Sequence, residues 1–185
     1  MQADIGNVLI TRARIADRVR ELGQQIAADL AGVGEDEEIV LVPILTGSII
    51  FVADLMRELP HKIRISLAMV SSYPGASVAS TGAKLIGNLP EDLTNRHVLI
   101  VDDILDSGQT IRLIRAQIMA RKPRSLRVCV LLRKETPAAM AVPCDYVGFD
   151  IPDEFVVGYG LDYDNFYRNL PEIGTLKKEA MSNDE

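Results

Sequence analysis

The chain alternates between short apolar runs and longer segments in which apolar side chains recur at helical spacing. The short runs predict strands at residues 38–45, 63–73, 97–105, 125–134, 146–152 and 155–161. The helical spacing predicts helices at residues 15–31, 48–59 and 110–122. The third helix should end before Pro123, because the residue that precedes a proline disfavours helical backbone.

This alternation predicts an α/β fold with a central, mostly parallel sheet flanked by helices. Strands of continuous apolar character must be covered on both faces, and the intervening helices supply that cover. No internal repeat, low-complexity segment or Pro/Gly-rich linker divides the 185 residues, so a single domain spanning 1–185 is expected. In open sheets of this kind ligands bind outside the carboxyl ends of the strands, which are therefore the places to search for chemistry.

Composition and charge exclude several classes of protein. With 48% hydrophobic and 25% charged residues the composition is typical of a soluble globular protein, and a net charge of −6 argues against sequence-independent binding of nucleic acid. We expect no membrane partner, because no apolar run reaches 18 residues and the charged N-terminus does not resemble a signal peptide. Two cysteines, Cys129 and Cys144, indicate a reducing compartment, so a cytoplasmic location is expected.

The stretch VLIVDDILDSGQT, residues 98–110, places three carboxylates beside an otherwise buried strand. Asp102 and Asp103 stand at the strand end, where they can bind the hydroxyls of a sugar or a hard cation. Asp106 follows them and is expected to be free to act as a base. The helix that begins next offers backbone N–H groups, hydroxyls and a flexible glycine, which together form a phosphate cradle from Ser107, Gly108, Gln109 and Thr110.

A plainer interpretation of this stretch is that Asp106 or Ser107 caps the next helix and that the aspartate pair is solvated. That interpretation does not explain why an apolar strand ends in two carboxylates with a third close behind. Other phosphate motifs fail: the chain has no G-x-x-x-x-G-K-[ST], and GYGLDY carries Tyr163 where a dinucleotide fingerprint needs its third glycine.

The same stretch resembles the phosphoribosyl-diphosphate (PRPP) motif of type I phosphoribosyltransferases: an apolar strand, two acidic residues, two apolar residues, Asp, Thr or Ser, Gly, any residue, and Thr. Four further segments resemble, in order, parts of the hypoxanthine-guanine branch of that family. They are PILTGSIIFVADLMREL, VSSYPGASVASTG, LLRKETP and YVGFDIPDEFVVGYGLDYDNFYRNLPEIGTL, and the resemblance covers about residues 39–176.

The resemblance implies an enzyme of purine salvage. It would transfer the 5-phosphoribosyl group from PRPP to a 6-oxopurine, hypoxanthine or guanine, giving IMP or GMP and pyrophosphate. It also implies the type I phosphoribosyltransferase fold with a small hood subdomain from the chain ends, Mg²⁺ as cofactor, and a homo-oligomer, either dimer or tetramer. A xanthine-preferring enzyme stays open. A PRPP-sensing regulator would usually add a DNA-binding module or a basic face, and this acidic chain shows neither.

Roles at the PRPP end follow from the resemblance. Asp102 and Asp103 would hold the ribose hydroxyls and magnesium, residues 106–110 would bind the 5′-phosphate, and Asp106 would handle the N7 proton of the purine. Pyrophosphate would contact Leu45, Thr46, Gly47, Arg168, and Ser72 and Tyr73 of a flexible flap at about 71–87. A cis peptide is expected at Leu45–Thr46. Thr46 departs from the pattern, because many relatives carry Lys or Arg there.

Roles at the purine end also follow from the resemblance. Lys134 would contact O6 of the base, and this contact selects an oxo over an amino purine because lysine donates and cannot accept hydrogen bonds. Phe155 would stack on the purine face, the main chain of Val156 would bond the base edge, and Asp162 would bind a second magnesium. The plainer alternatives are a solvated Lys134, a core Phe155 and a surface Arg168.

Overall fold

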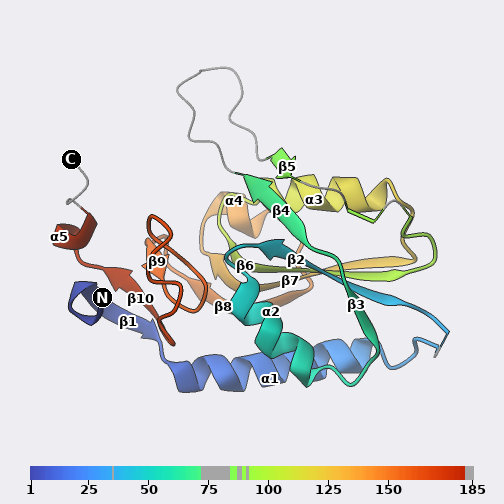
Figure 1. Cartoon of the computed structure of the whole chain (residues 1–185), viewed down its shortest axis with the longest axis horizontal. Helices are drawn as coiled ribbons and strands as arrows, with labels where there is room; N and C mark the ends of the chain where they lie inside the picture. The colour runs from blue at the N-terminus through green and yellow to red at the C-terminus, as the bar shows by residue number, and fades with distance from the viewer. Residues whose placement is uncertain (35, 72–83, 87–88, 91, 182–185) are drawn as a thin grey trace.

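The computed structural model describes residues 1–34, 36–71, 84–86, 89–90 and 92–181. Its centre is a seven-stranded sheet in which the strand order is β5-β4-β2-β6-β7-β8, with β3 also paired to β2 (Figure 1). All pairs are parallel except β4 with β5. The strands are β2 (Ile39–Leu45), β3 (Ile63–Ile65), β4 (Ala68–Ser71), β5 (Lys84–Ile86), β6 (His97–Leu105), β7 (Ser125–Lys134) and β8 (Tyr146–Ile151).

Helices cover both faces of this sheet, as the alternation in the sequence predicts. On one face lie α1 (Arg12–Asp29), α2 (Ile49–Leu55) and the short η2 (Met56–Glu58); on the other lie α3 (Gln109–Met119) and α4 (Pro137–Met140) (Figure 1). Successive residues of β2 enter opposite cores. Leu41 packs in the cluster that contains Ile15 of α1, whereas Val40 and Val42 pack in the cluster that contains Ile114 of α3. The expected α/β fold is therefore confirmed.

The chain ends build a second, smaller sheet, which corresponds to the expected hood. Its strands are β1 (Ile5–Ile10), β9 (Val156–Val157) and β10 (Ile173–Leu176), in the order β1-β10-β9 and antiparallel, flanked by η1 (Gln2–Asp4) and α5 (Lys178–Met181) (Figure 1). The sequence pattern missed β1 and β10. Half of the residues of β1 are exposed, in one unbroken run, and its pairing with β10 shifts register twice, so its residues show no clean alternation.

Two local features explain how the main elements begin and end. Thr11 caps α1, with its hydroxyl accepting the Arg14 N–H at 3.4 Å, and Thr136 caps α4 immediately before Pro137. The sequence suggested one strand at 63–73, and this prediction is wrong. The run divides into β3 and β4, which pair with the beginning and the end of β2, and between them the Ser66 N–H donates to Leu41 O at 2.9 Å.

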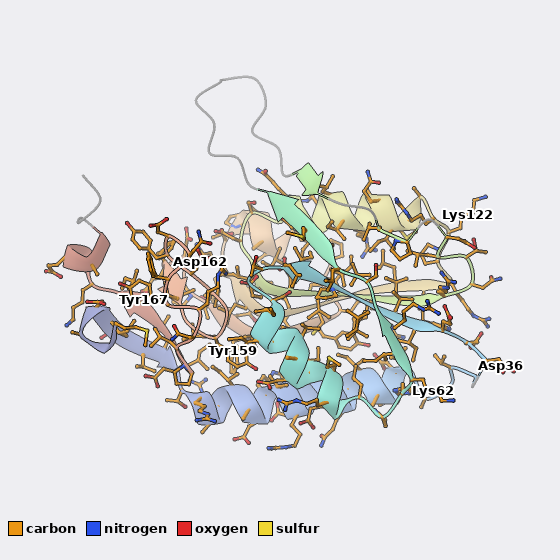
Figure 2. The ribbon with its side chains drawn as sticks, in the orientation of Figure 1. Asp36, Lys62, Lys122, Tyr159, Asp162 and Tyr167 are labelled. Atoms are coloured by element: carbon orange, nitrogen blue, oxygen red, sulfur yellow. The ribbon has the colours of Figure 1, made fainter. Side chains whose placement is uncertain are left out.

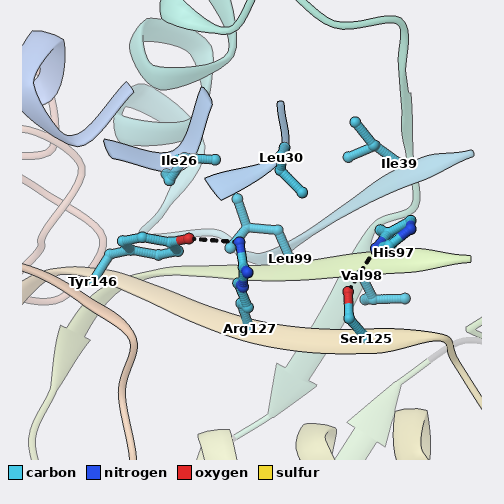
Figure 3. Close-up of a pocket in the computed structure, with 9 residues that line it drawn as sticks. All are labelled: Ile26, Leu30, Ile39, His97, Val98, Leu99, Ser125, Arg127 and Tyr146. Atoms are coloured by element: carbon cyan, nitrogen blue, oxygen red, sulfur yellow. Dashed lines mark hydrogen bonds between the residues drawn. The ribbon is translucent and has the colours of Figure 1, made fainter. Parts of the chain in front are cut away.

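A small cavity lies between α1 and the sheet, near the amino ends of β6 and β7 (Figure 3). Its volume of about 10 Å³ holds one water molecule at most, so it is no substrate pocket. Its polar side chains are paired: Arg127 donates to the Tyr146 hydroxyl at 3.0 Å, and the His97 Nδ1 and Ser125 Oγ atoms lie 2.8 Å apart. Among the described helices, none has both the length and the apolar character required to span a bilayer.

Candidate active site

The carboxyl ends of four neighbouring parallel strands meet at one edge of the central sheet. Because β2, β6, β7 and β8 lie side by side, the segments that follow them converge there. A cavity of about 320 Å³ opens at this edge, a volume within the range of small-molecule sites. Its lining consists of Ile44, Leu45, Gly47, Val70, Asp102, Asp103, Ile104, Leu105, Asp106, Ser107, Gly108, Thr110 and Ile111. A cavity therefore lies where the strand-end rule directs the search.

The aspartate pair is part of the lining of this pocket. Asp102 is only 6% exposed, and its Oδ1 accepts the Asp103 N–H at 3.1 Å. Burial raises the pKa of Asp102 well above its usual value, and the Asp103 charge adds to this rise; burial also raises the pKa of Asp103. Neither carboxylate forms an ion pair with any described residue. Two adjacent, desolvated carboxylates without a cationic partner fit a hard cation that substrate oxygens and water complete.

Glycines let three loops approach one another around this pair. A Cβ added to Gly47 would lie 2.7 Å from Asp103 Cγ and closer still to its Oδ2. A Cβ on Gly160 would clash with the carbonyl oxygen of Gly47, and Gly160 has a φ of +106° that favours glycine. The Leu45–Thr46 peptide is cis, which confirms that prediction.

The expected phosphate cradle is a loop that turns into α3. Gly108 precedes the helix in the left-handed conformation, with a φ of +74°, and an added Cβ would overlap Val142. The N–H groups of the first turn have no partner within a helix, and Gly108, Thr110 and Ile111 line the cavity. Ser107 Oγ accepts the Gln109 N–H at a long 3.4 Å, so helix capping does not account for the loop.

The sequence suggested that Asp106 is free. In the structure it is instead paired with Lys134. The Lys134 Nζ atom lies 3.1 Å from Asp106 Oδ2 and 2.9 Å from Asp153 Oδ1. The Lys134 side chain is only 12% exposed, which excludes the alternative of a solvated lysine. Burial lowers the pKa of Lys134, but the hydrogen bonds that its ammonium donates to Asp153 and Asp106 outweigh this effect and hold the pKa above its usual value. Lys134 is therefore a cation at the pocket edge.

An aromatic side chain stands nearby on the loop before β9. Phe155 is 49% exposed, so it is not a core phenylalanine, and its ring meets that of Tyr163 edge to face at 5.7 Å between centroids. The next residue, Val156, is buried in β9 and pairs with Thr175 of β10. Phe155 is thus half exposed on a backbone anchored in the hood.

Asp162 and Arg168 lie in the loops between β9 and β10. Figure 2 shows Asp162 at the end of the molecule opposite Lys62 and Lys122. The guanidinium of Arg168 lies 2.7 Å from Asp162 Oδ1 and donates to Gly160 O at 2.7 Å. Its charge also lowers the pKa of Asp103, although burial remains the larger influence. Arg168 is therefore not a solvated surface arginine, since its side chain is only 24% exposed and is held by Asp162 and Gly160.

The structure adds two residues that the sequence pattern did not identify, Arg112 and Asp153. Arg112 donates to the carbonyl oxygens of Ser107 at 3.0 Å and Ala138 at 3.3 Å, and so joins the cradle to α4. Asp153 follows β8, so the strand-end rule applied to that strand would have found it. Ser72, Tyr73 and most of the expected flap at 71–87 lie outside the described residues.

Comparison with known proteins agrees with this geometry. Residues 8–164 match the family model for the phosphoribosyl transferase domain. A hypoxanthine-guanine phosphoribosyltransferase from Mycobacterium bovis is 46% identical, covering 94% of this chain and 87% of the relative. A hypoxanthine phosphoribosyltransferase from Escherichia coli is 43% identical, covering 91% and 94%.

A solved structure supports the same assignment. The crystal structure of a hypoxanthine phosphoribosyltransferase from Staphylococcus aureus superimposes with a TM-score of 0.88 at 40% identity, covering 99% of this chain and 97% of the other. The sequence match, the shared fold and the strand-end pocket lead to one conclusion: this chain belongs to the phosphoribosyl transferase domain family.

Proposed function

We propose that this protein transfers the 5-phosphoribosyl group of PRPP to N9 of a 6-oxopurine, hypoxanthine or guanine, and releases pyrophosphate. The observation that carries the proposal is the strand-end pocket, which is lined by the aspartate pair and the helix-start cradle, with the cationic Lys134 paired to Asp106 of the same lining. The names of the relatives from M. bovis and E. coli support the choice of base. The products are IMP or GMP and pyrophosphate, the reaction of purine salvage.

PRPP occupies the end of the pocket formed by β2 and β6. Its 5′-phosphate accepts hydrogen bonds from the N–H groups and hydroxyls of residues 106–110, and its ribose hydroxyls donate to Asp102 and Asp103. The backbone of residues 45–47 and the guanidinium of Arg168 hold the pyrophosphate group, because a planar guanidinium suits phosphate oxygens. Thr46 brings no charge to this loop.

Magnesium is the proposed cofactor. Asp102 and Asp103 would hold one ion together with substrate oxygens, and Asp162 would hold a second beside the pyrophosphate. When bound, Mg²⁺ neutralises negative charge on the pyrophosphate leaving group. Asp162 pairs with Arg168 at 2.7 Å in this structure, so Arg168 can turn to pyrophosphate when Asp162 takes a new partner.

The purine lies next to the strand-end pocket, where Lys134 ends β7 and contacts Asp106 of the pocket lining. Lys134 donates to O6, Phe155 covers one face of the base, and the main chain of Val156 bonds its edge. The N9–C1′ bond forms as the C1′–oxygen bond to pyrophosphate breaks. Asp106 accepts the proton that leaves N7, a contribution of roughly 10²–10⁴-fold for general base catalysis.

Steady-state kinetics test this function directly. The purified protein is assayed with PRPP and Mg²⁺ against hypoxanthine, guanine, xanthine and adenine. We expect the highest kcat/KM for hypoxanthine or guanine and no turnover of adenine. If only xanthine were turned over, the substrate base would have to be reassigned to xanthine. If none of the purines gave a nucleotide product, the proposed transferase activity would be refuted.

Three accompanying properties belong to the same proposal. The protein acts as a single domain, and the exposed apolar side chains Ile49, Ile65, Leu67 and Met69 support self-association. Both cysteines are free thiols, which supports a reducing, cytoplasmic location. Light scattering of the purified protein distinguishes a dimer or tetramer from a monomer.

A further inference from the structure

Asp153 contacts the purine-recognition lysine from the side opposite the proposed general base. Its Oδ1 lies 2.9 Å from Lys134 Nζ, although the rest of its side chain is largely exposed at 64%. We infer that Asp153 is a positioning residue for the purine: it fixes the Lys134 ammonium between two carboxylates, so that the remaining N–H donor meets O6. The inference deepens the proposed function and rests on it.

The placement of Lys134 between two carboxylates follows from the order of the strands in the sheet. β6, β7 and β8 are adjacent and parallel, so their carboxyl ends lie side by side. Lys134 is the last residue of the middle strand and pairs in register with Ile151 of β8. Asp106 follows β6 and Asp153 follows β8, so one carboxylate reaches the ammonium from each neighbouring strand.

The number of donors on the ammonium limits what Lys134 can do. A lysine has three N–H donors and a flexible stem of four carbons, so a single contact does not fix its direction. Asp106 and Asp153 take two donors at 3.1 and 2.9 Å, which leaves one for the purine. Without Asp153, the ammonium would be drawn toward Asp106 and away from O6.

Glu154 provides a matched control on the same loop. It carries the same charge as Asp153 and is exposed, but the ion pairs of Lys134 involve only Asp106 and Asp153 among the described residues. A general effect of negative charge near the pocket would therefore appear in Glu154→Gln as well as in Asp153→Asn. A positioning effect would appear only in Asp153→Asn.

The kinetic test compares Asp153→Asn, Asp153→Glu and Glu154→Gln with wild type, using hypoxanthine and PRPP. In Asp153→Asn we expect KM for hypoxanthine to rise about three- to tenfold, because one partly exposed ionic contact is lost, while KM for PRPP stays the same. Asp153→Glu should recover part of the loss, and Glu154→Gln should match wild type. Equal changes in both KM values, or no change in either, would overturn the inference.

A second readout needs no turnover. Lysine residues of the unliganded proteins are modified with an amine-reactive reagent, and the rate at Lys134 is measured by peptide mass spectrometry. Asp153→Asn should speed modification of Lys134 several-fold relative to both wild type and Glu154→Gln, because the ammonium loses one of its two partners. Equal rates would overturn the inference. Loss of the proposed function would instead appear as an inactive wild type, so the two failures are distinguishable.

Discussion

The substitution Gly47→Ala should disturb the position of Asp103 while leaving the stability of the fold nearly unchanged. The new Cβ would lie 2.7 Å from Asp103 Cγ, whereas carbon atoms in contact normally lie about 3.5–4.0 Å apart. The Asp103 carboxylate must therefore move by about 1 Å. Because the clash is with the end of a side chain, the loss in unfolding free energy should stay below about 1 kcal/mol.

The effect on activity should be much larger. A displacement of about 1 Å at a group that positions substrate can cost about 100-fold in rate, so kcat/KM for PRPP should fall by about that factor. Gly32→Ala is the control, because nothing lies within 4 Å of its added Cβ. The assay pairs initial rates over a range of PRPP concentrations with thermal unfolding of each variant. A Gly47→Ala protein that keeps kcat/KM within threefold of wild type would refute the assigned role of Asp103.

Three further outcomes follow from named contacts. Arg112→Ala should raise KM for PRPP about three- to tenfold, because the arginine that links Ser107 O of the cradle to Ala138 O of α4 is lost. An unchanged KM would contradict this expectation. Tyr159→Phe should lower the unfolding free energy by about 1 kcal/mol in urea titrations, since the hydroxyl donates to Asp54 Oδ2 at 2.6 Å. Burial raises the pKa of Cys144 from 9.0 to about 11. At pH 8 the fraction of Cys144 present as thiolate should therefore be about 100-fold lower than for an ordinary exposed thiol, and its rate of reaction with a maleimide should fall by the same factor. Equal rates for Cys144 and a free thiol peptide would show that the thiol is not desolvated.

The central sheet could be predicted because its strands are buried on both faces. The apolar runs at 97–105 and 125–134 coincide with β6 and β7, since continuous burial leaves a continuous apolar pattern. Two of the hood strands, β1 and β10, could not be predicted in this way. In β1 half of the residues are exposed in one unbroken run, so no periodic signal appears. The apolar run at 155–161 did predict a strand there, but β9 has only two residues.

For the site, the sequence predicted where the pocket lies but not which side chains pair with one another there. The strand-end rule and the DDILDSG stretch located the pocket, because those features are local in sequence. The pairing of Lys134 with both Asp106 and Asp153 joins the ends of three strands, and no local pattern encodes which side chains meet there. The same is true of Arg168, whose contact with Asp162 depends on a loop in which Asp164, Asn165 and Tyr167 all have positive φ.

The most direct test of the proposed chemistry is IMP formation by wild type and Asp106→Asn, measured beside equilibrium binding of PRPP to each. The Asn side chain keeps the shape of Asp106 but cannot accept the purine proton as a base. We expect kcat for hypoxanthine to fall by roughly 10²–10⁴-fold, while the Kd for PRPP stays within threefold of wild type. An Asp106→Asn enzyme that forms IMP at nearly the wild-type rate would contradict the assignment of Asp106 as the general base.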